Sequence, residues 1–285
     1  AHNAKIHWVP ESVGSKRFGN WLADARDWNV SRNRFWGTPI PIWRCQACDH
    51  ETCMGSVDEL EAATGETVTD LHPHKVAHLH FECEECGGQK TRITDVFDCW
   101  FESGSMPYAQ DHYPFENSTR FEENFPAEFI AEGLDQTRGW FYTLLVLSTA
   151  LFDRPPFLNC IVNGMVLAED GSKMSKSKQN YPSPESVFDE YGADALRAYL
   201  INSPVVRAEP LKFSEVGVRE VVRTVLIPLR SAWSFFVQYA NIDGWSPNEG
   251  LRGVQTPSVD ERPELDRWLL SVLQSLTKDV NAQME

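Results

Sequence analysis

Residues 127–167 constrain the fold most strongly, because strand-like and helix-like segments alternate there in a fixed order. The apolar segment 128–131 is typical of a short strand, and the polar cluster 132–138 follows it directly. Thr137 is a predicted N-cap for a helix to about residue 152, and 159–167 is a predicted second strand. A strand, a crossover helix and a second strand form a βαβ unit, which implies a parallel sheet and an α/β fold. Ligands of such sheets bind beyond the carboxyl ends of the strands, where the polar cluster lies.

Helical patterns dominate the rest of the chain. They predict a short helix over 19–28, a helix over 192–202, a long helix over 214–239 with a bend at Pro228, and a last helix from about residue 263 onward. The Gly/Pro-rich stretch 241–263 is a predicted loop.

The composition excludes several classes of protein. Hydrophobic residues make up 42% of the chain and charged residues 24%, which is enough for a packed core. The 26 basic and 41 acidic residues give a net charge of −15, so the overall field repels phosphate and any nucleic-acid contact must come from local basic patches. The longest apolar run, Phe141–Phe152, is about 12 residues and too short for a bilayer. We therefore expect a cytoplasmic protein with no membrane partner.

Cysteine spacing predicts a metal site. Seven cysteines are present, and four form two C-x-x-C pairs inside a small inserted module, residues 42–95. In a cytosolic chain this spacing favours a structural zinc ion over disulfides, although the 34-residue gap between the pairs exceeds the usual gap. The predicted ligands are Cys45, Cys48, Cys83 and Cys86. A catalytic zinc is disfavoured, because four thiolates leave no open position. Reserve ligands, for which a solvated loop is the better interpretation, are Cys53, His72, His74, His78 and His80.

The pentapeptide Lys173-Met174-Ser175-Lys176-Ser177 follows a predicted strand and the Asp170-Gly171 turn. Two ammonium groups with hydroxyls between them suit a polyphosphate, and the lysines can meet the charge that develops as pyrophosphate leaves. Two lysines alone would indicate only a solvated loop. The whole motif in this context resembles the KMSKS signature of class I aminoacyl-tRNA synthetases.

Other segments extend this resemblance over about residues 6–240. They resemble the isoleucyl-tRNA synthetases in particular, and their sequences are most similar to the eukaryotic-type branch of that family. They are residues 27–43, 96–109, 132–140, 192–197 and 202–207. The resemblance implies the C-terminal half of a class I Rossmann-type catalytic domain with a zinc-binding insert, followed by a truncated α-helical bundle. It implies ATP and Mg²⁺ as well as structural Zn²⁺, with tRNA(Ile), L-isoleucine and ATP as partners of a monomeric parent enzyme.

The resemblance also implies roles for individual residues. Lys173 and Lys176 are the implied catalytic groups and bind ATP together with Gly164, Val166, Met174 and Ser175, with backbone near Gly164 and Val166 meeting adenine. The implied aminoacyl-adenylate contacts are Glu132, Gly133, Asp135 and Gln136, and Trp100 and Trp140 shape the side-chain pocket. Without the resemblance, 132–140 would indicate a capped helix start with a core tryptophan. The basic candidates for tRNA contact are Lys16, Arg17, Arg26, Arg32, Arg34, Arg207, Lys212, Arg219 and Arg223, and for any one of them a solvated face is the better interpretation.

The expected division of the chain is a catalytic segment 1–41, the zinc module 42–95, the catalytic segment 96–180 with the KMSKS loop, a stem-contact segment 181–213, and the start of the helical anticodon-binding domain over 214–285. A His-x-Gly-His motif, the other class I signature, is absent from the sequence. We expect the first half of the nucleotide fold and the editing domain to lie before residue 1, and the isolated chain to be inactive. The implied parent function is isoleucine–tRNA ligase; the alternatives are a valine or leucine ligase, or a non-catalytic fragment that binds tRNA or nucleotide.

Overall fold

The computed structural model describes residues 1–246 and 257–284. The chain separates into two compact units. The first holds Ala1–Ser186 and Arg197–Ser214, and the second holds Val187–Leu196 and the residues from Glu215 onward. The predicted functional residues, apart from Arg219 and Arg223, lie in the first unit.

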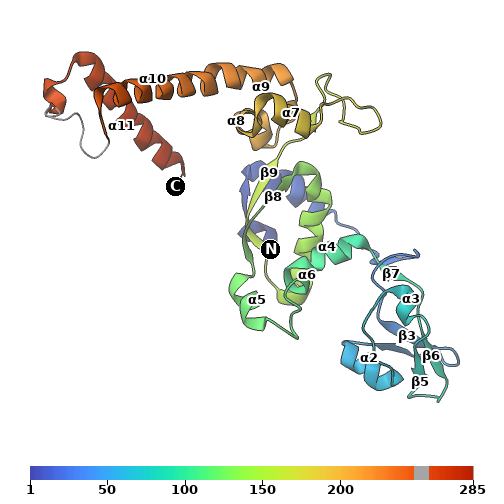
Figure 1. Ribbon diagram of the computed structural model, residues 1–285. Helices are drawn as coiled ribbons and strands as arrows, with labels where there is room; N and C mark the ends of the chain where they lie inside the picture. The colour runs from blue at the N-terminus through green and yellow to red at the C-terminus, as the bar shows by residue number, and fades with distance from the viewer. Residues whose placement is uncertain (247–256, 285) are drawn as a thin grey trace. The chain divides into compact units, whose positions relative to one another are not determined.

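A parallel three-stranded sheet forms the centre of the first unit (Figure 1). Its order is β1 (His7–Val9), β9 (Phe157–Asn163), β8 (Ala127–Gly133), and α6 (Trp140–Phe152) connects β8 to β9. The predicted βαβ unit and its parallel sheet are therefore confirmed. α6 is buried along one side because its apolar residues meet the sheet. The core comprises Ile6, Trp8, Val13, Phe18, Phe141, Leu144, Leu145, Phe157, Cys160 and Val162.

The start of the crossover helix differs from the prediction. Thr137 lies inside a 3₁₀ turn, Leu134–Arg138, and Gly139 is the N-cap of α6. The Thr137 hydroxyl donates to the Leu134 carbonyl at 2.8 Å and accepts from Arg17 Nε at 3.2 Å, so these hydrogen bonds join it to the turn and to the N-terminal segment rather than to the first N–H groups of α6. The Gln136 side chain caps α6 instead, because its Oε1 accepts the Trp140 N–H at 2.9 Å.

The predicted second strand, 159–167, is broken. β9 ends at Asn163, and β10 (Val166–Leu167) pairs in parallel with β11 (Leu211–Lys212) in a separate sheet. Gly164 marks the break, since its N–H donates to the Val205 carbonyl at 2.7 Å. A Cβ at this position would lie 1.8 Å from the Glu209 carbonyl oxygen, so only glycine allows the two backbones to approach so closely.

We expect Gly164→Ala to destabilise the protein by about 3 kcal/mol or more, because the clash is with backbone and relief requires the two segments to separate. Urea unfolding followed by circular dichroism measures the effect. Gly55→Ala is the matched control, since its nearest neighbour is the flexible end of Glu59, 3.3 Å from the added carbon. Equal stability of the two variants would contradict this account of the strand break.

The inserted module has its own sheet, of order β4-β3-β6-β5. The strands are β3 (Ile42–Cys45), β4 (Glu51–Cys53), β5 (His80–Glu82) and β6 (Gln89–Arg92), with the helices α2 (Val57–Thr64) and α3 (Pro73–Val76). Although the module is small, Trp43, Leu60, Val76 and Leu79 form a core of its own. Two short strands at its base, β2 (Ser31–Arg32) and β7 (Val96–Phe97), pair antiparallel.

Beyond β7, α4 (Cys99–Ala109) packs against α6, and α5 (Ser118–Asn124) follows. Near the N-terminus, a π-type turn, Val13–Phe18, leads into α1 (Gly19–Ala23), so the predicted helix 19–28 ends five residues early.

The later helices agree closely with the sequence pattern. α7 (Pro184–Tyr191) precedes α8 (Ala193–Ile201). The predicted long helix consists of α9 (Glu215–Val221), a π-type turn Val222–Leu226 and α10 (Ile227–Asp243). The wider turn precedes Pro228, which occupies the first turn of α10, where its missing N–H costs least. α11 (Glu264–Met284) is the expected last helix. Part of the predicted loop 241–263 lies outside the described residues. Within the described part of the chain, no helix has the length and apolarity that a membrane span requires.

Candidate active site

The polar cluster lies at the carboxyl ends of β8 and β9, as the sequence predicts. Gly133 and Asn163 are partners at the end of the two strands, and Glu132 precedes Gly133 on β8. Asp135 and Gln136 follow on the 3₁₀ turn. The Asp135 Oδ1 lies 2.6 Å from the position that a Cβ on Gly133 would occupy, so glycine allows this carboxylate to fold back over the strand end. Gln136 Nε2 donates to Asp135 Oδ2 at 3.4 Å.

Trp100, Gln136 and Trp140 are brought together around Gly139. A Cβ on Gly139 would lie 2.8 Å from Gln136 Oε1 and 3.0 Å from the Trp100 ring. Trp140 Nε1 donates to the Ser103 carbonyl of α4 at 2.9 Å. The two predicted pocket tryptophans therefore come from different helices that meet at the end of β8. Trp100 is 41% exposed, so part of its ring is accessible from solvent.

The close approach of α4 to α6 depends on Gly104. A Cβ there would lie 2.9 Å from a Leu147 methyl and 3.1 Å from the Thr143 backbone. A side chain at this position would push α4 outward and carry Trp100 away from Gly139.

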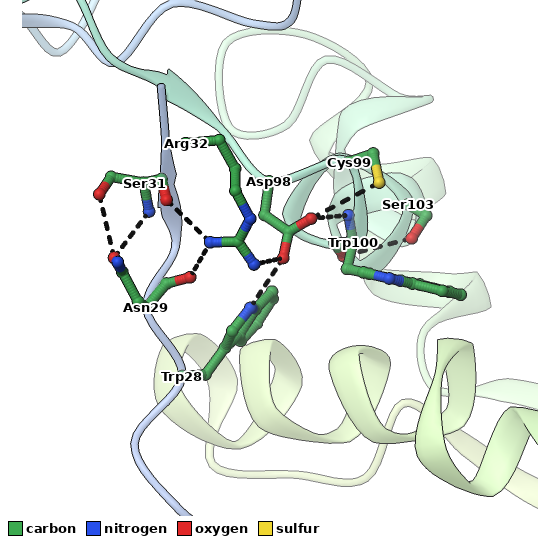
Figure 2. Close-up of polar contacts among 8 residues, drawn as sticks. All are labelled: Trp28, Asn29, Ser31, Arg32, Asp98, Cys99, Trp100 and Ser103. Atoms are coloured by element: carbon green, nitrogen blue, oxygen red, sulfur yellow. Dashed lines mark hydrogen bonds and ion pairs between the residues drawn. The ribbon is translucent and has the colours of Figure 1, made fainter. Parts of the chain in front are cut away.

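The sequence analysis missed Asp98, which lies between the segment 28–32 and α4 (Figure 2). Its carboxylate, on a residue 3% exposed, accepts hydrogen bonds from Trp28 Nε1 at 3.1 Å and Arg32 at 2.5 Å through Oδ2. Oδ1 accepts from the Trp100 N–H at 3.2 Å and the Cys99 thiol at 3.5 Å. Burial alone would raise the pKa of Asp98, but these hydrogen bonds and the nearby Arg32 charge outweigh it and lower the pKa below its ordinary value. The signal in the sequence was an N-cap residue directly before a helical pattern.

The loop 173–177 leaves its two lysines exposed. In the described part of the chain, neither ammonium group has a hydrogen-bond or ion-pair partner. The loop itself is held by Asn180, whose side chain accepts the Ser175 N–H at 2.9 Å and donates to the Lys173 carbonyl at 3.2 Å. Two unpaired cations on a braced backbone can bind a polyanion. Sequence reasoning missed Asn180, which lies three residues beyond the motif.

The backbone expected to meet adenine is partly occupied. The Gly164 N–H is bonded to Val205, so it is not available to a base. The Met165 carbonyl accepts from the Leu211 N–H of β11, and the Leu167 carbonyl accepts from the Phe213 N–H just beyond β11, at 2.9 Å each. Val166 takes part in neither of these two bonds, which leaves its backbone groups as the better candidates.

The four predicted thiols form one cluster. Their sulfur atoms lie within 4.8 Å of one another, with 3.5 Å between Cys45 and Cys86 and 3.7 Å between Cys48 and Cys83. Sulfurs at the corners of a tetrahedron around zinc are about 3.8 Å apart, given a Zn–S distance of about 2.3 Å. Gly88 permits this crowding, since a Cβ there would lie 3.0 Å from the Cys45 sulfur.

The electrostatics of the cluster fit a cation. The Ala47 N–H lowers the pKa of Cys45 to about 6. The His50 backbone lowers the pKa of Cys48, but the neighbouring thiols and burial outweigh it and raise that pKa to about 12. Four sulfurs this close therefore do not all become thiolates unless a cation balances their charge. The donor set is that of a structural zinc site.

The reserve ligands lie outside this cluster. Cys53 is exposed, and His72 and His78 pair with Asp70 and Glu66. A second group, His50, Cys83 and Glu84, was not predicted. It surrounds the fully buried Lys90, whose Nζ lies 3.0 Å from His50 Nδ1 and donates to Glu84 Oε2 at 2.5 Å. The hydrogen bond from Lys90 lowers the pKa of Glu84 to about 2.

Several basic candidates for tRNA contact have internal partners. Arg17 donates to Thr137, Arg32 to Asp98, Arg219 to Tyr191 and Arg223 to Glu220. Arg32 also donates to the carbonyls of Asn29 and Ser31, so its guanidinium is occupied by the protein. Of the basic candidates for tRNA contact, Arg32 is therefore not favoured.

A cavity of about 190 Å³ lies beside α4 and β8. Its lining is largely apolar and includes Met106, Phe121, Phe129 and Trp140. Of the predicted site residues, Trp140 lines this cavity, whereas the polar residues at the end of β8 do not. The cavity therefore lies beside the polar cluster and not within it.

The comparisons with known proteins agree with this arrangement. Residues 1–212 match the family described as tRNA synthetases class I (I, L, M and V). The chain belongs to this family. Two solved structures have the same fold: a methionyl-tRNA synthetase of Mycobacterium tuberculosis in complex with methionyl-adenylate (TM-score 0.60, 18% identity, 98% of this chain and 43% of that one), and an Agrobacterium radiobacter LeuRS in a ternary complex with tRNA and LeuAMS (TM-score 0.59, 21% identity, 84% and 33%).

Within the family, several curated proteins similar to this chain at more than 50% identity are isoleucine–tRNA ligases, which confirms the resemblance drawn from the motifs. The chain is 53% identical to that of Treponema denticola, 57% to the cytoplasmic one of Mus musculus and 55% to the cytoplasmic one of Caenorhabditis elegans. The matches cover 99%, 96% and 100% of this chain, but 26%, 22% and 25% of those proteins. The chain therefore spans about a quarter of the length of these relatives.

Proposed function

We propose that this chain is part of the catalytic region of an isoleucine–tRNA ligase. The observation that carries the proposal is identity above 50% to isoleucine–tRNA ligases over nearly the whole chain. The polar strand end, the two tryptophans and the exposed lysine loop support it, because they offer groups for an amino acid, a side-chain pocket and a polyphosphate. The cytoplasmic names of two relatives support a cytoplasmic location.

In the first step the isoleucine carboxylate attacks the α-phosphorus of ATP, bound with Mg²⁺. The bond from that phosphorus to the bridging oxygen breaks, and pyrophosphate leaves. Glu132 and Asp135 are carboxylates suited to the substrate ammonium group or the ribose hydroxyls. Lys173 and Lys176 stabilise the negative charge that develops on the pyrophosphate oxygens.

In the second step a hydroxyl of the terminal tRNA ribose attacks the adenylate carbonyl carbon. AMP leaves with the electron pair of the broken bond, and the hydroxyl proton is released. Trp100 and Trp140 restrict the shape of the accepted side chain. Cys45, Cys48, Cys83 and Cys86 would hold a zinc ion, which would stabilise the inserted module and, with four thiolate ligands, would have no open position for a substrate.

The decisive measurement is pyrophosphate exchange by the full-length protein with ATP, Mg²⁺ and each of the twenty amino acids. We expect exchange with isoleucine at least about tenfold above that with valine or leucine, because valine lacks a methylene that would fill a pocket for isoleucine, worth about 1–3 kcal/mol, and leucine branches at a different carbon. A preference for valine or leucine would identify a sibling ligase. No exchange with any amino acid would favour a non-catalytic protein that binds tRNA or nucleotide.

A further inference from the structure

The position of Trp100 depends on the first turn of α4. In the described part of the chain, its indole nitrogen has no hydrogen-bond partner, and its ring, on a residue 41% exposed, approaches Gly139. The backbone N–H of Trp100 is bound by Asp98 Oδ1. The orientation of this exposed ring therefore follows from how the helix start is held.

Asp98 is bound to the segment 28–32 by both its backbone and its side chain. Its N–H donates to the Val30 carbonyl at 2.8 Å, and Oδ2 accepts from Trp28 and Arg32. Arg32 is in turn fixed by two backbone carbonyls of its own segment. Figure 2 shows that the two carboxylate oxygens of Asp98 have different partners: Oδ1 faces the start of α4, and Oδ2 faces the segment 28–32.

Aromatic packing strengthens the same connection. The Trp28 ring lies 6.3 Å from the Phe101 ring, between centroids, and Phe101 stacks on Phe97 at 4.2 Å. The first turn of α4 is thus held by Trp28 and Phe97 as well as by Asp98. A displacement of segment 28–32 would be transmitted to Trp100 through Asp98.

We propose that Asp98, with Arg32 and Trp28 as its partners, is a positioning residue that fixes the Trp100 wall of the amino-acid pocket. The proposal rests on the proposed function. Asp98 acts on specificity through Trp100 and does not itself touch the substrate. The side chain of Arg32 serves this purpose and not tRNA binding.

The first test follows Trp100 directly by ¹⁹F NMR of the full-length protein labelled with 5-fluorotryptophan. The Trp100 resonance is assigned by its loss in Trp100→Phe. We expect Asp98→Ala to shift and broaden this resonance and to leave that of Trp43, in the core of the inserted module, unchanged. Asp111→Ala is the matched control, since Asp111 is also a buried acid paired with an arginine, Arg120, at 3.2 Å. An unmoved Trp100 resonance in Asp98→Ala would overturn the proposal.

The second test measures KM for isoleucine and for ATP by pyrophosphate exchange. We expect Asp98→Ala to raise KM for isoleucine by about tenfold or more and to leave KM for ATP nearly unchanged. Asp98→Ser, which keeps a capping hydroxyl but loses the contact with Arg32, should fall between Asp98→Ala and the original protein. In a Trp100→Ala background, Asp98→Ala should add no further change, because its effect acts through the missing ring.

An undiminished effect of Asp98→Ala in the Trp100→Ala background would show a general structural role and refute the positioning role. Failure of the unaltered protein to use isoleucine would count against the proposed function instead. The ¹⁹F measurement would still decide whether Asp98 positions Trp100.

Discussion

Replacing Lys176 by alanine is expected to lower the rate of isoleucine-dependent pyrophosphate exchange by about 10²- to 10³-fold. The ammonium group has no partner in the described part of the chain, so its removal leaves no buried group unsatisfied and should not affect folding. The loss should appear in kcat, with KM for isoleucine nearly unchanged, because the interaction strengthens as pyrophosphate charge develops.

Lys178→Ala is the matched control for this prediction. Lys178 is exposed on the same loop and outside the motif, so its removal makes an equal change in net charge. We expect a change of less than about threefold, since an exposed charge outside the site is largely screened. Equal losses in the two variants would mean that the loop acts through its overall charge rather than through Lys176.

Replacing Cys83 by serine is expected to abolish zinc binding and to unfold the inserted module. Binding of a structural zinc ion contributes about 10 kcal/mol or more to folding in small domains, and three thiolates and a hydroxyl hold it far more weakly. The metal content is measured by mass spectrometry, and unfolding of the module by the fluorescence of Trp43, which lies in its core.

Cys53→Ser is the control, because Cys53 is an exposed thiol of the same module outside the cluster. It should retain one zinc ion per chain. Retention of zinc by Cys83→Ser, or absence of zinc from the unaltered protein, would contradict the four-thiol site.

Much of the fold could be predicted because local patterns decide it. The apolar crossover helix, the short strand segments on either side of it and the late helices are each indicated by local sequence and are present in the structure. The cysteine cluster could be predicted from spacing, because a short C-x-x-C turn directs both thiols to one side. The boundaries of the expected domains remain a prediction.

The differences from prediction arise from contacts between distant segments. The strand break at Gly164 depends on the backbone at Glu209. The Gln136 cap of α6 is the local exception, because it arises from the 3₁₀ turn directly before the helix. Asp98 was missed for the same reason as the strand break, since its partners Trp28 and Arg32 lie about seventy positions away. Sequence patterns report faces of helices and strands, but they do not report which loop meets them.

Because β2 and β7 pair at the base of the inserted module, the position of Trp100 does not depend on how long the insertion is. The segments that enter and leave the inserted module are joined next to this pair by two hydrogen bonds. The Phe97 N–H donates to the Thr38 carbonyl, and the Ile40 N–H donates to the Asp95 carbonyl. The entropy of closing the intervening loop depends only weakly on its length. Residues between these two points can therefore be added, removed or exchanged in evolution or in the laboratory, and Asp98 will still be presented to α4 in the same register.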